Sequence, residues 1–329
     1  MQMSPAQVAL SWAPQRGSAF LTTSTKPQRI SANYQISPLP DDAMSEIRDH
    51  ITTNIRFNSV VQTGVPGFIP RPTRPEVAEE RSMDRVAVIT GASRGIGAAT
   101  ASVLAEKRFR VVVNYRSSTE EADAVVGAVK AAGGEACSIR ADVTNPDEVA
   151  SMFSETERRW GRVDVLVHNA LIPYDVVSFA DLSWEQLGGK LDRELHAAFL
   201  VTKAVVPGMI SRSFGRLIYM TTILSRRPRE GMINLGTAKA AMDQFVRYVA
   251  LEVSPHGITA NLVSPATVAG ATSDKLLASD DVRRLGASNP MGRLVTPHEV
   301  AQTIAFVGSE DSGFITGHCV EVNGGLAMD

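Results

Sequence analysis

The stretch Ile233 to Phe245, INLGTAKAAMDQF, carries one lysine, Lys239, among small residues in a helical pattern. Positions three and four apart lie on one face of a helix, so Leu235 lies one turn before Lys239 on the same side. A lysine in such a setting usually acts on a neighbour that carries a proton, because its charge lowers the neighbour's pKa. Leucine has no proton to give, so this stretch keeps the cation without the expected partner.

A glycine-rich turn follows the first strand-like run and opens an amphipathic helix. Glycine permits a tight turn and lets backbone N–H groups approach a pyrophosphate, while the helix N-terminus adds its positive dipole end. The spacing TGxxxGxG between a strand and a helix therefore predicts a dinucleotide site. The turn residues that we expect at the cofactor are Gly91, Ser93, Arg94, Gly95, Ile96 and Gly97.

The end of the second strand-like run indicates which dinucleotide to expect. An acidic side chain there would pair with the ribose of NAD. The run ends instead in Asn114, Tyr115 and Arg116, with no acid. Arg116 and Arg94 can face a 2′-phosphate, for which a guanidinium is well suited. We therefore expect NADP(H), with Asn114 and Arg116 among the cofactor-binding residues; the alternative is that both arginines are simply solvated.

From Arg85 onward, apolar strand-like runs alternate with amphipathic segments of helical length. Repeated βα units with continuous apolar strands predict an α/β fold, a doubly wound and mostly parallel seven-stranded sheet of Rossmann type. The predicted strands are Arg85–Thr90, Arg110–Tyr115, Ala136–Arg140, Val163–His168, Arg216–Met220, Thr259–Val263 and His318–Val322.

Composition and charge limit the class of protein and its partners. The chain has 329 residues, 44% apolar and 21% charged, with a net charge of −2. This balance is typical of globular proteins and gives no electrostatic reason to expect nucleic acid or an anionic membrane as a partner. No apolar run approaches the ~20 residues that span a bilayer, and we expect no secretory signal. Cys137 and Cys319 are expected to be reduced in a cytoplasmic protein, without a metal site.

Residues 62–75, QTGVPGFIPRPTRP, are rich in glycine and proline, which interrupt regular structure. We therefore divide the sequence into an N-terminal segment of residues 1–61, a linker of residues 62–83 and a domain of residues 84–329. The N-terminal segment is an incomplete extension in front of the Rossmann-type domain.

The N-terminal segment contains SPAQVALSWAPQRG, followed by AFLTTSTKPQRISANYQISPLPDDAMSEI. It resembles the last βα portion of an aldo-keto reductase barrel, in which a Ser, an Arg and an Asn bind the adenosine phosphate of the cofactor. Ser24, Arg29 and Asn33 match their spacing, whereas Thr23 stands at the usual lysine. A closed barrel needs eight strands, and this piece has at most one. We expect either a remnant of such a protein or a recruited docking or oligomerisation arm.

Several motifs occur in order along residues 84–329. They are the glycine turn, ADV at Ala141–Val143, HNA at His168–Ala170, FLVTKAVVPGM at residues 199–209 and MGRLVTPHEVAQTIAFVGSEDSGFITGHCVEVNGG at residues 291–325. Together they resemble the short-chain dehydrogenase/reductase family, in the style of the ketoacyl-carrier-protein reductases. The resemblance implies that Asp142 and Val143 lie in the segment at the adenine ring, and that Asn169 and Ala170 border the cofactor.

In that family a Tyr and a Lys four residues apart carry the chemistry, and the lysine corresponds to Lys239. The lysine binds the nicotinamide ribose and lowers the pKa of the tyrosine, which exchanges a proton with the substrate oxygen as hydride moves. The tyrosine position holds Leu235. The serine that holds the oxygen corresponds to Thr222, and an asparagine that supports a water relay to the lysine corresponds to Glu194.

Three further positions depart from the family pattern. Leu171 follows Asn169-Ala170 where a glycine is usual, Pro265 is followed by Ala266 in place of glycine, and Gly270 stands where a threonine is expected. The departures therefore cluster at the nicotinamide end, whereas the adenosine end matches. Pro265 itself is kept as a cofactor-binding residue.

Loss of the tyrosine predicts loss of ordinary carbonyl reduction, because general acid–base help is worth ~10²–10⁴ in rate. A substitute acid could come from Tyr174, in the loop after the fourth strand, from Glu194 or from His196. Tyr174 could equally be a loop aromatic and His196 a residue of the helix surface. Glu194 is expected to form an ion pair with Lys239, or to act as a base if its pKa is raised.

Two classes of function stay open, because fold alone does not choose between them. The first is an atypical NADP(H)-binding enzyme that acts on a small hydrophobic, polyketide-like substrate, either by reduction with a substitute acid or by non-redox isomerisation, dehydration or cyclisation. The second is a non-catalytic subunit in a hetero-oligomer, since the family usually forms dimers or tetramers through long helices that this sequence matches. The catalytic candidates are Thr222, Lys239, Glu194 and Tyr174.

Overall fold

The structure of the protein is a computed structural model that describes residues 38–44, 85–270 and 279–327. The chain divides into two units, Met1–Arg74 and Pro75–Asp329, and this division falls within the expected linker of residues 62–83. In the first unit the described residues 41–44 are helical. The aldo-keto reductase resemblance, with Thr23, Ser24, Arg29 and Asn33, lies outside the described residues.

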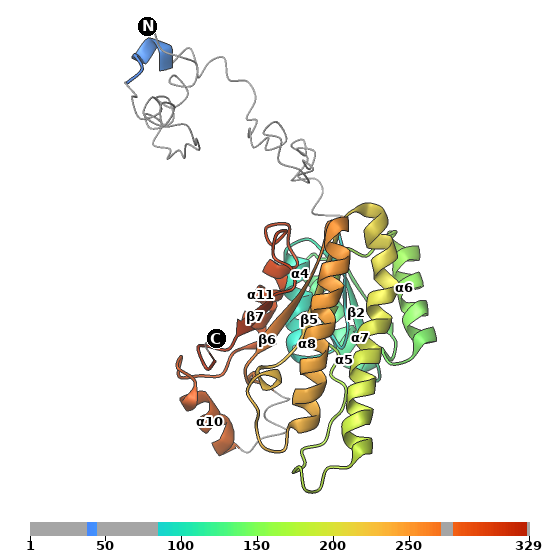
Figure 1. The fold of residues 1–329 in the computed structure, drawn as a ribbon. Helices are drawn as coiled ribbons and strands as arrows, with labels where there is room; N and C mark the ends of the chain where they lie inside the picture. The colour runs from blue at the N-terminus through green and yellow to red at the C-terminus, as the bar shows by residue number, and fades with distance from the viewer. Residues whose placement is uncertain (1–37, 45–84, 271–278, 328–329) are drawn as a thin grey trace. The chain divides into compact units, whose positions relative to one another are not determined.

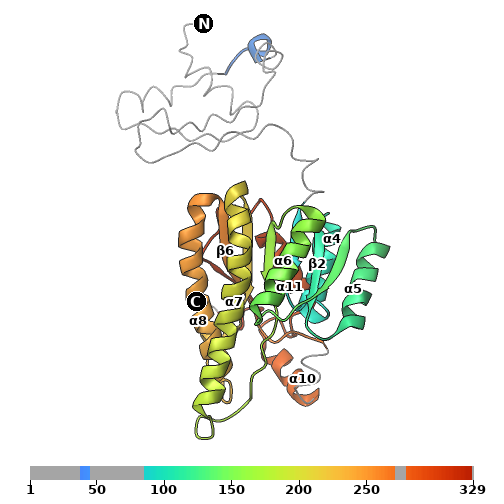
Figure 2. The same cartoon turned by 90° about the vertical axis from the view of Figure 1, so that its right-hand side faces the viewer.

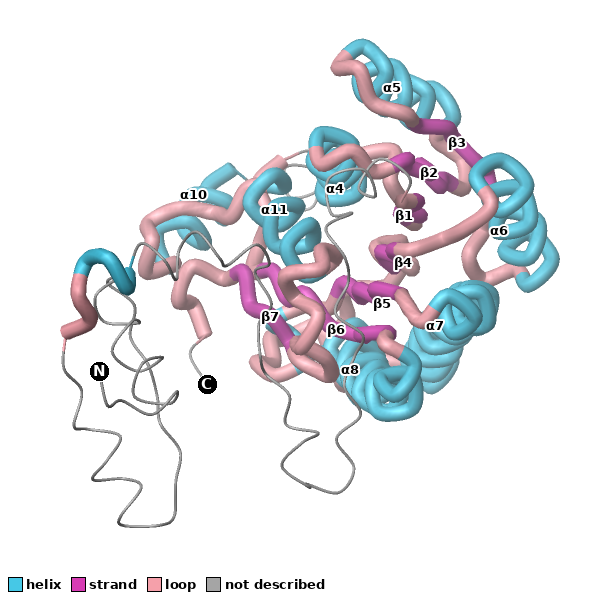
Figure 3. Tube along the Cα trace, turned by 90° about the horizontal axis from the view of Figure 1, so that it is seen from above, coloured by secondary structure: helices cyan, strands magenta, loops and turns pink. Residues whose placement is uncertain are grey.

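The second unit is built on a seven-stranded sheet with the strand order β3-β2-β1-β4-β5-β6-β7. Figure 1 shows the ribbon, and the strand order can be followed in Figure 3. Every strand pairing is parallel. The predicted α/β class is confirmed, and each predicted strand is present to within two residues at either end. The strands are β1 Val86–Ile89, β2 Arg110–Tyr115, β3 Ala136–Arg140, β4 Val165–His168, β5 Gly215–Met220, β6 Ile258–Pro265 and β7 Cys319–Val322.

Helices cover both faces of the sheet, as Figure 3 shows from above. One face carries α4 Gly95–Glu106, α5 Thr119–Ala131 and α11 Pro297–Val307. The other carries α6 Pro146–Trp160, α7 Trp184–Arg212 and α8 Ile233–Val253, which stand side by side in Figure 2. The remaining elements are α10 Ser279–Ser288 and the 3₁₀ turns η3 Ile223–Ser225 and η4 Ser254–His256. No helix in the described part of the chain is long and apolar enough to cross a membrane.

The two faces have separate apolar cores because side chains alternate along each strand. In β5, Leu217 and Tyr219 point to the side of α7 and α8, whereas Ile218 and Met220 point to the side of α4 and α11. Burial on both faces explains why the strands read as continuous apolar runs. Cys137 and Cys319 are free thiols in buried strand positions, as expected from the sequence.

Helices α7 and α8 pack on each other and hold two of the predicted site residues. Helix α7 begins at a capping box, in which Ser183 and Gln186 each satisfy a backbone N–H of the other. The buried side of α7 meets that of α8 in one core, through residues such as Val201 and Val246. Glu194 lies on the buried side of α7 and Lys239 on that of α8, so this packing brings the two together.

The strand order reverses between β1 and β4. Strand β1 pairs with β2 on one side and with β4 on the other, and the chain then leaves β1 toward α4 on one face and β4 toward α7 on the opposite face. Connections that diverge in this way leave a crevice at the carboxyl ends of the strands, where ligands bind in open α/β sheets.

Candidate active site

The turn between β1 and α4 needs glycine at several positions. Gly91 and Gly95 have φ angles of +61° and +56°, in the left-handed region that other residues rarely adopt. A Cβ at Gly97 would lie 2.6 Å from the Gly91 carbonyl oxygen, so the start of α4 approaches the turn too closely for a side chain. Ser93 and Ile96 are half-buried in this segment. Arg94 makes no side-chain cap for α4, and the helix N-terminus fits a pyrophosphate.

The turn is tied to the loop after β4 by hydrogen bonds. Asn169 Nδ2 donates to the carbonyl oxygens of Thr90 and Gly91, both at 3.0 Å. The Thr90 hydroxyl accepts from the backbone N–H groups of Asn169 and Ala170, at 2.9 and 3.0 Å. The predicted residues Gly91, Asn169 and Ala170 therefore lie together at the strand-order reversal. Thr90 was not predicted, although it directly precedes the glycine turn.

Asn114 is buried beneath the glycine turn. Its Oδ1 accepts from the backbone N–H of Gly91 at 3.2 Å, and its Nδ2 donates to the carbonyl oxygens of Ile139 and Ala141 at 3.3 and 3.0 Å. The side chain thus links the carboxyl ends of the adjacent strands β1, β2 and β3. We conclude that Asn114 positions the glycine turn from below.

The two predicted arginines lie at the carboxyl end of β2. Arg94 donates from NH2 to the hydroxyl of Ser118 at 2.7 Å, which brings it from the glycine turn to the start of α5. Arg116 is 59% exposed, and its NH1 lies 3.9 Å from Asp142 Oδ2. The exposed Arg94 guanidinium and the first turn of α5 are therefore neighbours at the carboxyl end of β2, where Arg116 follows the strand. Ser118 was missed from the sequence because its partner is 24 residues away.

Asp142 and Val143 follow β3 and form the adjacent wall. Asp142 Oδ1 accepts from the N–H and the hydroxyl of Thr144, at 2.9 and 2.7 Å. Burial raises the pKa of Asp142, but these hydrogen bonds and the charge of Arg116 lower it further, so the net pKa lies below the ordinary value. Val143 is buried in the core. An ionised Asp142 can accept a further hydrogen bond from a ligand.

Lys239 lies at the carboxyl ends of β4 and β5, where its ammonium group has two oxygen partners. Nζ donates to the carbonyl oxygen of Met220 at 2.7 Å and lies 2.7 Å from Glu194 Oε1. The expected ion pair between Glu194 and Lys239 is therefore present. Leu235, one turn earlier on α8, is buried and presents only hydrocarbon to this region.

Glu194 is shared by two lysines. Its Oε2 accepts from Nζ of Lys190, which lies four residues earlier on α7 and was not predicted. Burial raises the pKa of Glu194, but the charges of Lys239 and Lys190 outweigh it and hold the pKa far below the ordinary value. A role of Glu194 as a base was expected only if its pKa were raised, and this condition is not met. The spacing of Lys190 and Glu194, four apart on one helix, was the signal available in the sequence.

The other predicted catalytic residues lie at different depths. Thr222, at the start of η3, is half-buried, and its hydroxyl accepts from the backbone N–H of Leu224 at 3.4 Å. Tyr174 is half-buried in the loop after β4, and its ring centroid lies 5.8 Å from Nζ of Lys190. His196 is exposed on α7 and does not belong to the buried cluster, which matches its interpretation as a surface residue.

The remaining departures surround this region. Pro265 ends β6 in register with Val322, and Ala266 is buried directly after it. Gly270 is exposed, with a φ of +126°. Leu171 is 57% exposed in the loop after β4, so its side chain projects outward from that loop.

A buried histidine adjoins the cluster. His168 ends β4, with Nδ1 3.4 Å from the Thr90 hydroxyl and its ring edge-on to Tyr219. Burial, and then the charge of Lys239, lower its pKa to about 4. Tyr219 is itself fully buried, bonds the Thr202 hydroxyl at 2.6 Å and has its pKa raised by burial, so it is no replacement for the missing acid.

Comparison with known proteins agrees with this geometry. The family model described as Enoyl-(Acyl carrier protein) reductase matches residues 91–327. The chain belongs to the short-chain dehydrogenase/reductase family. The match begins at the glycine turn and ends after β7, so it covers nearly the whole second unit.

Curated relatives of this dehydrogenase/reductase align over almost their full length. A 3-oxoacyl-[acyl-carrier-protein] reductase of Synechocystis sp. is 38% identical over 245 residues, which is 74% of this chain and 97% of the relative. The corresponding FabG protein of Staphylococcus epidermidis is 35% identical over 75% of this chain and 100% of the relative. The short-chain reductase protein NovJ of Streptomyces niveus is 36% identical over 78% of this chain and 98% of the relative.

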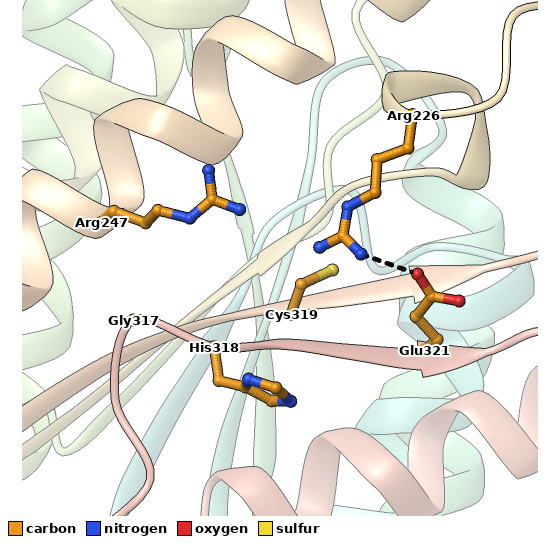
Figure 4. Close-up of a pocket in the computed structure, with 6 residues that line it drawn as sticks. All are labelled: Arg226, Arg247, Gly317, His318, Cys319 and Glu321. Carbon is orange, nitrogen blue, oxygen red and sulfur yellow. Dashed lines mark hydrogen bonds and ion pairs between the residues drawn. The ribbon is translucent and has the colours of Figure 1, made fainter. Parts of the chain in front are cut away.

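A separate pocket of about 480 Å³ lies at the sheet edge beside β7 (Figure 4). Arg226 and Arg247 reach it from η3's end and from α8, and NH1 of Arg226 lies 3.0 Å from Glu321 Oε1. None of its lining residues is a predicted cofactor or catalytic residue. Within the described ranges, no group of three or more His, Cys, Asp or Glu side chains could hold a metal ion.

Replacing Glu194 by Gln is expected to destabilise the fold. The change leaves two buried ammonium groups beside a neutral amide, and removal of one partner from a buried ion pair costs roughly 3–5 kcal/mol. Urea unfolding at pH 7 measures this difference. Glu252→Gln, at an exposed position of α8, should change the free energy of unfolding by less than about 0.5 kcal/mol; equal effects of the two variants would contradict the buried-cluster account.

His168 predicts a pH dependence of stability. Its folded pKa of about 4 lies below the ordinary histidine value of 6.5, so between these values the unfolded chain binds a proton that the native protein does not. Stability due to the neutral ring is therefore complete above pH 6.5 and is lost as pH falls toward 4, by about 3 kcal/mol in total. His168→Asn should remove this loss in urea unfolding series between pH 7 and pH 4.5. His196→Asn, at an exposed position, should leave it unchanged.

Proposed function

We propose that this protein is an atypical short-chain dehydrogenase/reductase that binds NADP(H) and acts on a small hydrophobic, polyketide-like substrate without the usual tyrosine. The observation that carries the proposal is a glycine turn shaped for a dinucleotide next to Lys239, combined with the buried Leu235 at the position of the proton donor. The cofactor end of the site is complete, and the chemical end is altered.

The cofactor assignment is supported by the fit of the turn. The close approach at Gly97 and the uncapped start of α4 leave room and N–H donors for a pyrophosphate. Asp142 is available to the adenine side, and Lys239 retains a donor for a ribose hydroxyl beyond its contacts with Glu194 and Met220. NADP(H), when bound, would supply or accept a hydride.

The choice of NADP(H) over NAD(H) is supported by the side chains at the end of β2. Arg94, Arg116 and the hydroxyl of Ser118 gather beside the first turn of α5, and Asn114 stands in place of an acid. Guanidinium groups pair well with a phosphate. This arrangement suits a 2′-phosphate better than a free ribose hydroxyl.

The reaction itself must proceed without Leu235 contributing a proton. Thr222 keeps a hydroxyl that can hold a substrate oxygen. Tyr174 is the remaining candidate for the acid, because the charges of two lysines keep Glu194 ionised and so without a proton to donate. The site therefore supports either reduction with Tyr174 as a substitute acid or a non-redox isomerisation, dehydration or cyclisation. The activity named for two of the relatives is that of a 3-oxoacyl-[acyl-carrier-protein] reductase, and we do not extend it to this chain.

The second candidate function is a non-catalytic subunit that assembles with a related chain. It is favoured by apolar side chains on the outer sides of α7 and α8, where Phe199, Tyr248 and Leu251 are 47%, 61% and 72% exposed. Helical faces of this kind suit assembly into dimers or tetramers. A homo-oligomer through the same helices is equally compatible with the enzyme proposal. We retain a cytoplasmic location and a docking role or remnant origin for residues 1–61 as parts of this proposal.

Titration with NADPH and NADH, followed by cofactor fluorescence, tests the binding proposal. We expect NADPH to bind more tightly, and Arg116→Ala to weaken NADPH about tenfold without changing NADH, because one charge-assisted contact is worth about 1.4 kcal/mol. Lys130→Ala, on the exposed last turn of α5, is the matched control. Absence of NADPH binding would contradict the proposed NADP(H)-binding enzyme and leave the partner-subunit function, which predicts a mixed oligomer with an active relative.

Replacing Leu235 by Tyr should restore reduction of small ketones with NADPH. The new hydroxyl would lie one turn from Lys239, and general acid help of this kind is worth ~10²–10⁴ in rate. Leu235→Phe fills the same space without a hydroxyl and should remain as slow as the native protein. Equal rates for the Tyr and Phe variants would show that the altered residue is not what limits ketone reduction.

A further inference from the structure

Lys190 is a buried lysine between packed helices, and it makes polar contacts with its own helix and with the loop before it. The residue is 1% exposed. Nζ donates to Glu194 Oε2 on its own helix and to the carbonyl oxygen of Ile172 at 2.8 Å, and it lies over the face of Tyr174. Ile172 and Tyr174 belong to the β4–α7 loop, residues 169–183, which borders the site.

The burial of this ammonium group depends on Glu194. Taking a lone charge into the interior is unfavourable, and a buried charge persists only when it is paired and hydrogen-bonded. Burial lowers the pKa of Lys190, the charge of Glu194 raises it, and the charge of Lys239 lowers it. The net pKa lies below the ordinary value. Lys190 and Lys239 therefore compete for one carboxylate and occupy its two oxygens separately.

A carboxylate that is held at both oxygens has a fixed plane. Oε2 is set by Lys190, and Oε1 then sets Nζ of Lys239, whose other partner is the carbonyl oxygen of Met220. The position of Lys239 is thus linked to the β4–α7 loop through Glu194 and Lys190. Without Lys190, Glu194 would be free to turn toward Lys239 alone. The β4–α7 loop would lose its buried attachment to α7 and keep the exposed one, in which Gln186 Nε2 donates to Asp175 Oδ2 at 3.2 Å.

We propose that Lys190 is the positioning residue of this site, which fixes Lys239 through the shared Glu194 carboxylate and fixes the β4–α7 loop through its own contacts. The part that concerns Lys239 rests on the proposed binding of NADP(H). The part that concerns the loop does not, because it follows from the hydrogen bond to Ile172 and the cation–π contact with Tyr174.

The test compares Lys190→Met with Lys203→Met, which makes the same change at an exposed position of α7. In the cofactor-free full chain, hydrogen–deuterium exchange of residues 171–177 should become about tenfold faster in Lys190→Met, because the loop opens locally more often. The Lys203 variant should exchange as the native protein does. Equal exchange in the native protein and Lys190→Met overturns the proposal.

A second variant separates positioning from general damage. Lys190→Met should weaken NADPH binding about tenfold, because Glu194 can reorient. In the double variant Lys190→Met with Glu194→Gln, the carboxylate that Lys190 orients is replaced by a neutral amide beside Lys239. The affinity for NADPH should therefore return to within about threefold of the native value. Failure of the double variant to recover overturns the role toward Lys239. If the native protein itself does not bind NADPH, the proposed function fails, and the exchange experiment still decides the role of Lys190 at the loop.

Discussion

The reversal of strand order between β1 and β4 is the constraint on which the site depends. Both strands end at the same edge of the sheet, but their connections go to α4 on one face and toward α7 on the other. Parallel strands whose connections diverge must leave an opening there. Thr90 and Asn169 then join the two sides of this opening by hydrogen bonds between the side chain of each and the main chain of the other. With Asn114 bonded to Gly91 from below, the glycine turn is held from two directions. Every residue of the proposed cofactor pocket inherits its position from this arrangement.

The charged cluster of the site is an addition to this scaffold. Helices α7 and α8 pack through apolar side chains, yet they enclose Lys190, Glu194 and Lys239 with almost no exposed surface. Such a cluster stabilises the fold little in comparison with an apolar contact of the same size. The cluster lies next to an apolar Leu235, and its one carboxylate holds two ammonium groups in place, which suits a role in orienting groups.

Much of the fold was readable because its signals are local. Continuous apolar runs gave the seven strands, and the glycine spacing after β1 predicted the turn that the structure shows. The Glu194–Lys239 pair was also predictable, since the family pattern places both positions beside the site. Thr90 and Ser118 were not predicted, because each acts through a partner from another element. Lys190 was also not predicted, although its four-residue spacing from Glu194 was visible, because its burial and its bond to Ile172 depend on the fold. The direction of the Glu194 pKa depends on the balance between its burial and the charges beside it, and neither the burial nor the second lysine was predicted from the sequence.

The buried cluster also restricts the order in which its residues could have been acquired. A lysine at position 190 without a carboxylate at position 194 would leave an uncompensated ammonium group inside the protein, whereas Glu194 with Lys239 alone is a matched pair. The carboxylate must therefore appear before Lys190 in any stepwise history and can disappear only after it. A descendant with a tyrosine at position 235 would still carry this coupled pair, so the new hydroxyl would meet a lysine whose position is already set by a carboxylate.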